Sequence, residues 1–149
     1  MSLQNNISDL IIKSMKAKEK NRLEALRAIK NAILLINTKT ADSKELTYTE
    51  EIQLLQKLVK QRRESAEIYN SQKRHDLAKL EEDEALIIQD FLPKQLNKSE
   101  IEINISKIID EFNPNGMKDM GRIMRIANNK MEGKADGKTI SMILKKLLS

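Results

Sequence analysis

The chain has 149 residues, enough for one ordinary domain or for two small helical units. The absence of cysteine excludes disulfides, thiolate zinc sites and cysteine nucleophiles, and an aromatic content of 3% disfavours a base-stacking platform for nucleic acid. Hydrophobic residues make up 40% of the chain and charged residues 33%, with four Gly and two Pro, a composition that favours amphipathic helices.

The net charge of +5 is concentrated in the last third of the chain. From Lys94 onward there are eleven basic and seven acidic residues, a balance of +4, whereas residues 1–93 hold sixteen basic and fifteen acidic residues, a balance of +1. We therefore expect a polyanion, if one binds, to meet the C-terminal part.

The N-terminal segment predicts two amphipathic helices. The first covers Leu3–Ala17 with Ser2 as its N-cap, and the second runs from about Lys20 to Asn37 before a polar loop at Thr38–Lys44. Polar residues interrupt this region every few positions, so that it lacks the apolar run of a signal peptide or a membrane span. We expect a cytoplasmic protein without membrane contact.

Two segments with seven-residue patterning come next, Thr49–Tyr69 and Arg74–Phe91. The turn at Asn70–Asp76 predicts that they fold back as an antiparallel hairpin. The expected seam positions are Ile52, Leu55, Val59, Arg62, Ala66 and Tyr69 on the first helix and Leu77, Leu80, Glu84, Ile87 and Phe91 on the second.

Each of these two seams contains one charged residue. Pairing Tyr69 with Leu77 aligns Arg62 with Glu84, so that each charge meets its opposite. Either charge alone would be desolvated without compensation. The register therefore predicts a structural ion pair between Arg62 and Glu84, which sets alignment rather than performing catalysis.

Pro93 predicts the end of the hairpin and a boundary between two parts, because proline lacks an N–H and restricts the residue before it. The sequence thus predicts an all-α protein with an N-terminal helical domain at 1–93 and a small C-terminal three-helix bundle at 94–149.

Three short helices are expected after Pro93. Ser99 and Glu102 have the spacing of a capping box for the first, which ends near Asn113–Gly116. The second covers Met117–Met131, with an apolar side of Met117, Met120, Ile123, Met124, Ala127 and Met131. Turn glycines Gly133 and Gly137 then flank Asp136, the expected N-cap of the last helix.

The most informative cluster of charges lies on and after this second helix. Its members are Lys118, Arg122, Arg125, Lys130, Lys134 and Lys138. One interpretation is a surface that binds the RNA backbone through charge and shape. The alternative is an ordinary solvated polar face, since amphipathic helices usually direct Lys and Arg outward.

Other chemistry is disfavoured. The string Gly133–Thr139 is similar to a phosphate-binding loop, but it has three residues between its glycines where that loop has four, and a helix rather than a strand precedes it. His75 is the single histidine and is expected in a solvated turn, and the consecutive acids Glu81–Glu84 point in different directions. We predict no catalytic residue, metal or cofactor.

Several short motifs occur in order over nearly the whole chain: Leu26–Arg27 with Ile29–Lys30, Gln61–Arg62 with Glu64–Ser65, Arg74 with Asp76–Leu77–Ala78, Phe91–Leu92–Pro93–Lys94–Gln95–Leu96, Met120–Gly121, and Gly133–Lys134–Ala135–Asp136–Gly137. Together these motifs resemble the GatB/YqeY family, and specifically YqeY-like proteins.

This resemblance implies a C-terminal module similar to the tail of the B subunit of glutamine-dependent aspartyl/glutamyl-tRNA amidotransferase, a tail associated with tRNA. It transfers no catalytic residue to this chain. The leading hypothesis is a tRNA-associated helical binding protein. The alternatives are an accessory factor in carbon-nitrogen ligase activity with glutamine as amide donor, working with an amidotransferase or another protein partner, and a helical protein-interaction module without nucleic acid.

Overall fold

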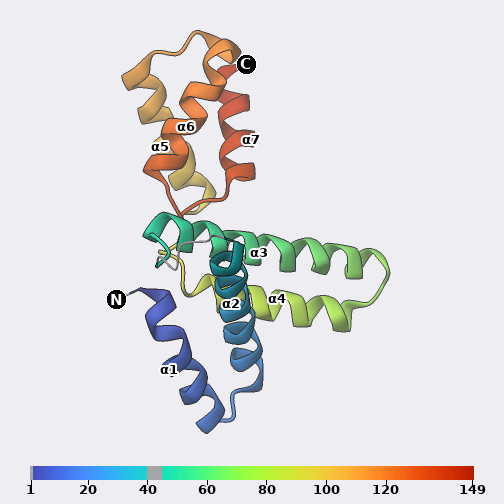
Figure 1. Cartoon of the computed structure of the whole chain (residues 1–149). Coiled ribbons are helices and arrows are strands. Elements are labelled where there is room, and N and C mark those ends of the chain that lie inside the picture. Colours follow the sequence, from blue (N-terminus) through green and yellow to red (C-terminus); the bar gives the residue numbers. More distant parts are fainter. Residues whose placement is uncertain (1, 40–44) are drawn as a thin grey trace. The chain divides into compact units, whose positions relative to one another are not determined.

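The computed structural model describes residues 2–39 and 45–149, which form helices and no strand (Figure 1). The predicted all-α class is confirmed. The elements are α1 Leu3–Lys16, α2 Lys20–Lys39, α3 Tyr48–Ser71, α4 His75–Gln89, α5 Lys98–Phe112, the 3₁₀ helix η1 Gly116–Asp119, α6 Met120–Lys130 and α7 Gly137–Leu148. The expected loop at Thr38–Lys44 falls partly outside the described residues, and Thr38 and Lys39 belong to α2.

The chain divides into two compact units, Met1–Leu92 and Pro93–Ser149. Each unit has a hydrophobic core of its own. The division falls one residue before the boundary expected from Pro93, where the proline interrupts helical hydrogen bonding.

The first unit packs α1, α2, α3 and α4 around an aliphatic core. Ser2 caps α1 by accepting a hydrogen bond from the Asn5 N–H at 3.3 Å, as the sequence predicts. The buried core residues are Ile7, Ala25, Leu26, Ile29, Ile33, Leu46, Leu54, Leu55, Leu58 and Ile88.

A capping box sets the start of α3. The Thr47 hydroxyl accepts from the Glu50 N–H at 3.2 Å, and the Glu50 carboxylate accepts from the Thr47 N–H at 2.7 Å. Glu51 is buried and accepts from the Gln4 N–H, while the Gln4 side chain accepts from the Leu46 N–H at 3.0 Å. These bonds join the beginning of α1 to the beginning of α3.

Helices α3 and α4 lie side by side, joined by the short turn at residues 72–74 (Figure 1). Three alanines are almost fully buried along them, Ala66 on α3 and Ala78 and Ala85 on α4. Because alanine has a small side chain, it lets two helix backbones approach closely.

The expected seam of α4 is wrong at Leu80, whose side chain is 57% exposed. The buried side of α4 follows Ala78, Ala85 and Ile88, so the helix is rotated relative to the heptad assignment. A heptad pattern gives weight to the large apolar residues, whereas two of the three buried positions here are alanines.

The second unit encloses its own core between α5, α6 and α7. The expected Ser99 and Glu102 capping box is wrong: Asn97 is the N-cap of α5 and accepts from the Glu100 N–H at 2.8 Å. Asn113 ends α5 in the left-handed conformation, with φ of 42°. The buried core residues are Ile101, Ile105, Ile108, Ile123, Ala127, Met131, Ala135, Ile140, Ile143 and Leu144.

The expected helix Met117–Met131 is divided into η1 and α6. Met117 therefore leaves the apolar side of the helix and is 45% exposed, contrary to the expectation from a single helical period. A 3₁₀ helix has three residues per turn, so its side chains are out of phase with those of the α-helix that follows.

Candidate nucleic-acid interface

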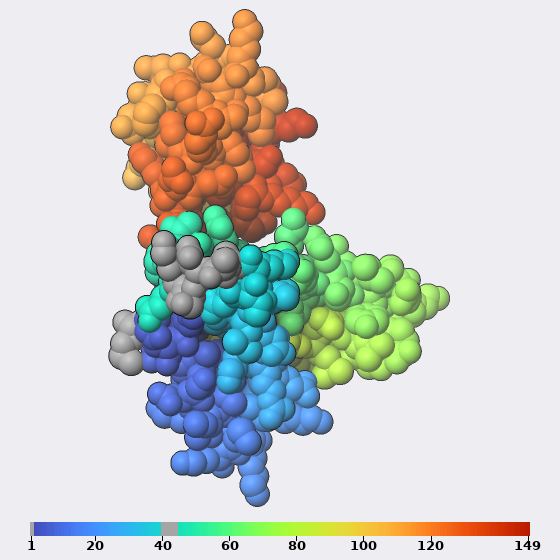
Figure 2. Space-filling model, viewed as in Figure 1, coloured from blue at the N-terminus to red at the C-terminus, as the bar shows by residue number. Residues whose placement is uncertain are grey.

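Helix α6 has one side in the core and the other in solvent. Ile123 and Ala127 are fully buried, while Arg122 and Arg125 are exposed on the opposite side. At 100° per residue this division follows directly from their positions. Figure 2 shows the second unit from α5 to α7 as one packed body, with α6 at its surface.

All six cations expected from the sequence are exposed. Lys118 lies in η1, Arg122, Arg125 and Lys130 lie on α6, Lys134 lies in the connection that follows, and Lys138 is the second residue of α7. The structure therefore displays all six on the second unit, but their neighbours differ.

Arg122 is partly neutralised and held in place by residues before α6. Its Nη2 atom lies 3.5 Å from Asp119 Oδ2 and donates to the Phe112 carbonyl at 3.5 Å. The hydrogen bond from the Asn115 N–H at 2.7 Å, followed by the charges of Arg122 and Lys118, lowers the pKa of Asp119 below its ordinary value. Asp119 therefore stays ionised and reduces the local positive potential.

Lys130 faces α5 rather than the outer side of α6. Its Nζ lies 3.3 Å from Glu111 Oε2 and 5.8 Å from the centroid of the Phe112 ring. The sequence grouped Lys130 with the other cations because it is basic and adjacent to the loop. The structure separates it by pairing it with a carboxylate from another helix.

Within the part of the chain that the structure describes, Lys118, Arg125, Lys134 and Lys138 form no salt bridge within 4.0 Å. No described carboxylate lies within salt-bridge distance of these four side chains, although the charge of Lys118 acts on Asp119. These four cations are consequently the ones with the most charge available to an anionic partner.

The connection between α6 and α7 is held by hydrogen bonds to the segment after Pro93. Gln95 Nε2 donates to the Gly133 carbonyl at 2.6 Å, and the Leu96 N–H donates to the Lys134 carbonyl at 2.9 Å. Gly133 is buried and has φ of 74°, the left-handed conformation expected of a helix stop. The backbone of Lys134 is thus anchored while its side chain is exposed.

Asp136 caps α7, because its carboxylate accepts a hydrogen bond from the Thr139 N–H at 3.3 Å. Gly137 is the first residue of α7, and the space around its Cα is open. A carboxylate at this helix start competes with a phosphate for the same N–H groups. The backbone here is arranged as a capped helix rather than as a phosphate-binding loop.

Gln95, Lys145 and Lys146 were not among the predicted site residues. Gln95 lies in one of the family motifs, but its bond to Gly133 joins residues 38 apart, which no local pattern predicts. Lys145 and Lys146 are exposed on α7, and their spacing from Lys138 on a helix would have revealed them.

In the first unit, Arg62 Nε lies 3.2 Å from Glu84 Oε1, with side-chain exposures of 18% and 24%. The expected ion pair is present. Arg62 also donates to the Leu58 carbonyl at 3.3 Å, and both residues lie between packed helices, which fits a structural role.

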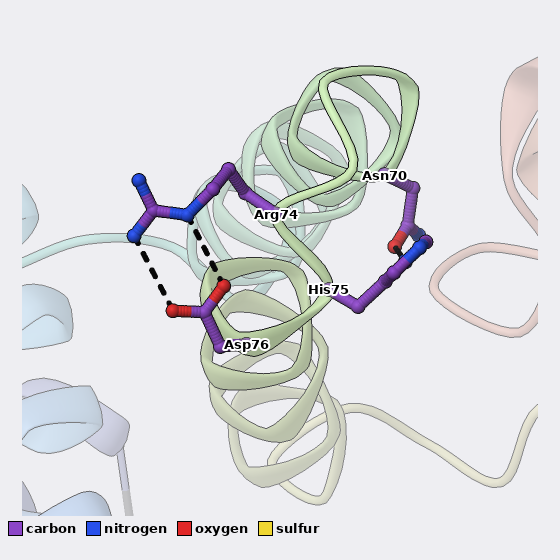
Figure 3. A network of polar contacts seen from close by, with 4 residues as sticks. All are labelled: Asn70, Arg74, His75 and Asp76. Atoms are coloured by element: carbon purple, nitrogen blue, oxygen red, sulfur yellow. Dashed lines mark hydrogen bonds and ion pairs between the residues drawn. The ribbon is translucent and has the colours of Figure 1, made fainter.

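His75 is exposed, as expected, but it is the first residue of α4 rather than part of the turn at residues 72–74 (Figure 3). Its Nδ1 lies 2.8 Å from Asn70 Oδ1. Beside it, Arg74 and Asp76 form two hydrogen bonds of 3.3 Å, which raise the pKa of Arg74 and lower that of Asp76 (Figure 3).

The acidic run Glu81–Glu84 does not gather into a ligand set. Over the described ranges, no group of three or more His, Asp and Glu side chains is arranged to hold a metal ion. Nor does any helix in those ranges have the length and apolar character to cross a bilayer.

The described residues define an all-helical protein of two units, the second of which displays exposed cations. The family model described as Yqey-like protein matches residues 4–148, so the chain belongs to the YqeY-like protein family. This match confirms the family resemblance inferred from the sequence motifs. A search of curated proteins finds no match.

Proposed function

We propose that the second unit is a binding module for the tRNA backbone. The observation that carries this proposal is that Lys118, Arg125, Lys134 and Lys138 are exposed without a salt bridge among the described residues, on the unit that holds most of the net positive charge. Cations without a carboxylate partner release counterions from phosphates most effectively.

Membership of the YqeY-like family implies a module similar to the tail of an amidotransferase B subunit, and this implied likeness supports tRNA as the class of RNA. The scarcity of aromatic side chains, 3% of the chain, supports contacts with phosphate and sugar over base stacking. Such binding is guided by charge and shape and depends strongly on salt concentration.

Filter binding to tRNA at several salt concentrations tests this proposal. Lys118→Ala, Arg125→Ala and Lys134→Ala combined should weaken binding and reduce the slope of log affinity against log salt by about two to three, roughly one unit per lost phosphate contact. Undetectable binding of the unaltered protein at low salt, or equal binding by the triple variant, would contradict the proposal.

A matched control removes the same charge from the first unit. Lys57, Lys60 and Lys79 are exposed on α3 and α4, and changing all three to Ala should leave the salt slope unchanged. If this control weakened binding as much as the triple variant, only total charge would matter, and the second unit would not be a specific binding module.

The salt bridges also predict which individual cations contribute most to tRNA binding. Arg125 has no salt bridge among the described residues, whereas Lys130 is paired with Glu111. Arg125→Ala should therefore weaken tRNA binding more than Lys130→Ala does, and the reverse order would remove Arg125 from the interface.

A further inference from the structure

Helix α7 has an exposed methionine surrounded by lysines. Met142 is 64% exposed, and Lys138, Lys145 and Lys146 lie four residues before, three after and four after it. At this spacing all three lie beside Met142 on the helix surface. Helix α7 contains no acidic residue, and within the described residues these lysines form no salt bridge.

Helix α4 has the same arrangement with the opposite charge. Leu86 is 57% exposed, and Glu82, Asp83 and Asp90 lie four residues before, three before and four after it. None of these three acids takes part in a salt bridge with another described residue. One lysine, Lys79, lies on the same side of the helix.

We propose that the α7 face of one copy of this chain docks on the α4 face of a second copy. Met142 and Leu86 would be the apolar centres, and the three lysines of one copy would surround the acids of the other. The lengths are compatible: α7 has 12 residues and α4 has 15, or about 18 Å and about 22 Å at the usual rise per residue.

A phosphate backbone would also attract the lysines of α7, but it offers no apolar partner to Met142. Leu86 offers one, because leucine and methionine side chains pack against each other without a strict geometry. A charge pattern and an apolar contact therefore point to the same occupant. Charges at the rim of such a contact mainly steer association, so the contact is weak and sensitive to salt.

The inference does not rest on the proposed tRNA binding. Lys145 and Lys146 lie outside the six cations of the candidate interface, so that substituting them leaves Lys118, Arg122, Arg125 and Lys134 in place. Association and tRNA binding are thus measured with different variants, and either can fail alone.

Sedimentation velocity on the nuclease-treated protein tests the proposal. The acidic variant, Lys145→Glu with Lys146→Glu, has two acidic faces, and the basic variant, Glu82→Lys with Asp90→Lys, has two basic faces. All four side chains are exposed, and circular dichroism verifies that each variant is folded.

We expect the unaltered protein to associate reversibly with rising concentration at low salt, and each variant alone to associate about tenfold more weakly or not at all. Mixing the two variants should restore association, because each α7 face then meets an α4 face of opposite charge. The control Lys57→Glu with Lys60→Glu, on α3, should associate like the unaltered protein.

An unaltered protein that stays monomeric at every salt concentration would overturn the proposal. So would variants that associate as strongly as the unaltered protein, or a mixture that stays monomeric while both variants are folded. Association that needs added tRNA would likewise overturn it, because the α7 face would then be occupied by RNA rather than by a second copy.

Discussion

Arg62 Nε lies 3.2 Å from Glu84 Oε1, joining α3 to α4 beside the apolar core that Leu58 of α3 and Ile88 of α4 share. With side-chain exposures of 18% and 24%, the pair is neither fully solvated nor fully buried. Its loss should therefore have an effect between those of exposed and buried ion pairs.

Glu84→Ala should lower the free energy of unfolding by about 1–2 kcal/mol, because Arg62 would keep its charge without its partner. Glu84→Gln retains an acceptor and should have about half that effect. Replacing both, Arg62→Met with Glu84→Leu, should recover stability to within about 1 kcal/mol. Urea denaturation followed by circular dichroism measures all three. A double replacement worse than Glu84→Ala would show that the ion pair stabilises the packing of α3 and α4 more than apolar side chains do.

Ala78 is almost fully buried on α4. Ala78→Leu should destabilise the first unit by about 1–3 kcal/mol, because the added methylenes have no space between the helices. Leu80→Ala, two residues away at a 57% exposed position, should change stability by less than about 1 kcal/mol. Thermal melts of both variants test this order. A larger loss of stability for Leu80→Ala than for Ala78→Leu would favour the predicted heptad seam, in which Leu80 is buried.

The two glycines that flank Asp136 should respond oppositely to alanine. Gly133→Ala should destabilise the second unit by about 1–2 kcal/mol, because φ of 74° is unfavourable for a residue with a Cβ. Gly137 begins α7 with open space around it, so Gly137→Ala should be neutral or stabilise by about 0.5 kcal/mol. Equal effects in urea denaturation would contradict the different backbone conformations.

Asp119 should contribute to the pH dependence of stability. Its pKa in the folded protein is lowered, first by the Asn115 N–H and then by the charge of Arg122. The stabilisation is therefore fully present above its ordinary pKa of 3.8 and is lost as the pH falls through the lower folded value.

Melting temperatures of the unaltered protein and of Asp119→Asn, measured from neutral pH down to acid, isolate this contribution. The two curves should be separated at neutral pH and converge as the pH falls below 3.8, because protonated Asp119 resembles asparagine. A separation that stays constant at all pH values would mean that the charge of Asp119 has no effect on stability.

Much of the local structure could be predicted from the sequence. The positions of the helices follow from hydrophobic periodicity, and Ser2, Asn113 and Asp136 have side chains that commonly begin or end helices. The exposure of Arg122 and Arg125 also follows, because an amphipathic helix directs its polar side outward.

The predictions from the sequence were wrong where two local alternatives were equally suitable or where the packing of another segment decided the outcome. The cap of α5 fell at Asn97 rather than Ser99, since both side chains suit that position. Met117 became exposed because the chain turns through η1 before α6 begins. Leu80 became exposed because α4 is rotated so that Ala78, Ala85 and Ile88 are its buried residues.

The sequence by itself determined the helical class, the division near Pro93, the excess of positive charge in the second unit and the Arg62 partner of Glu84, because these depend on composition and on regular spacing. Only the tertiary structure decided which cations are neutralised. Lys130 pairs with Glu111 of another helix, and Gln95 anchors the connection that contains Lys134. Such contacts arise from packing between segments that are distant in the chain.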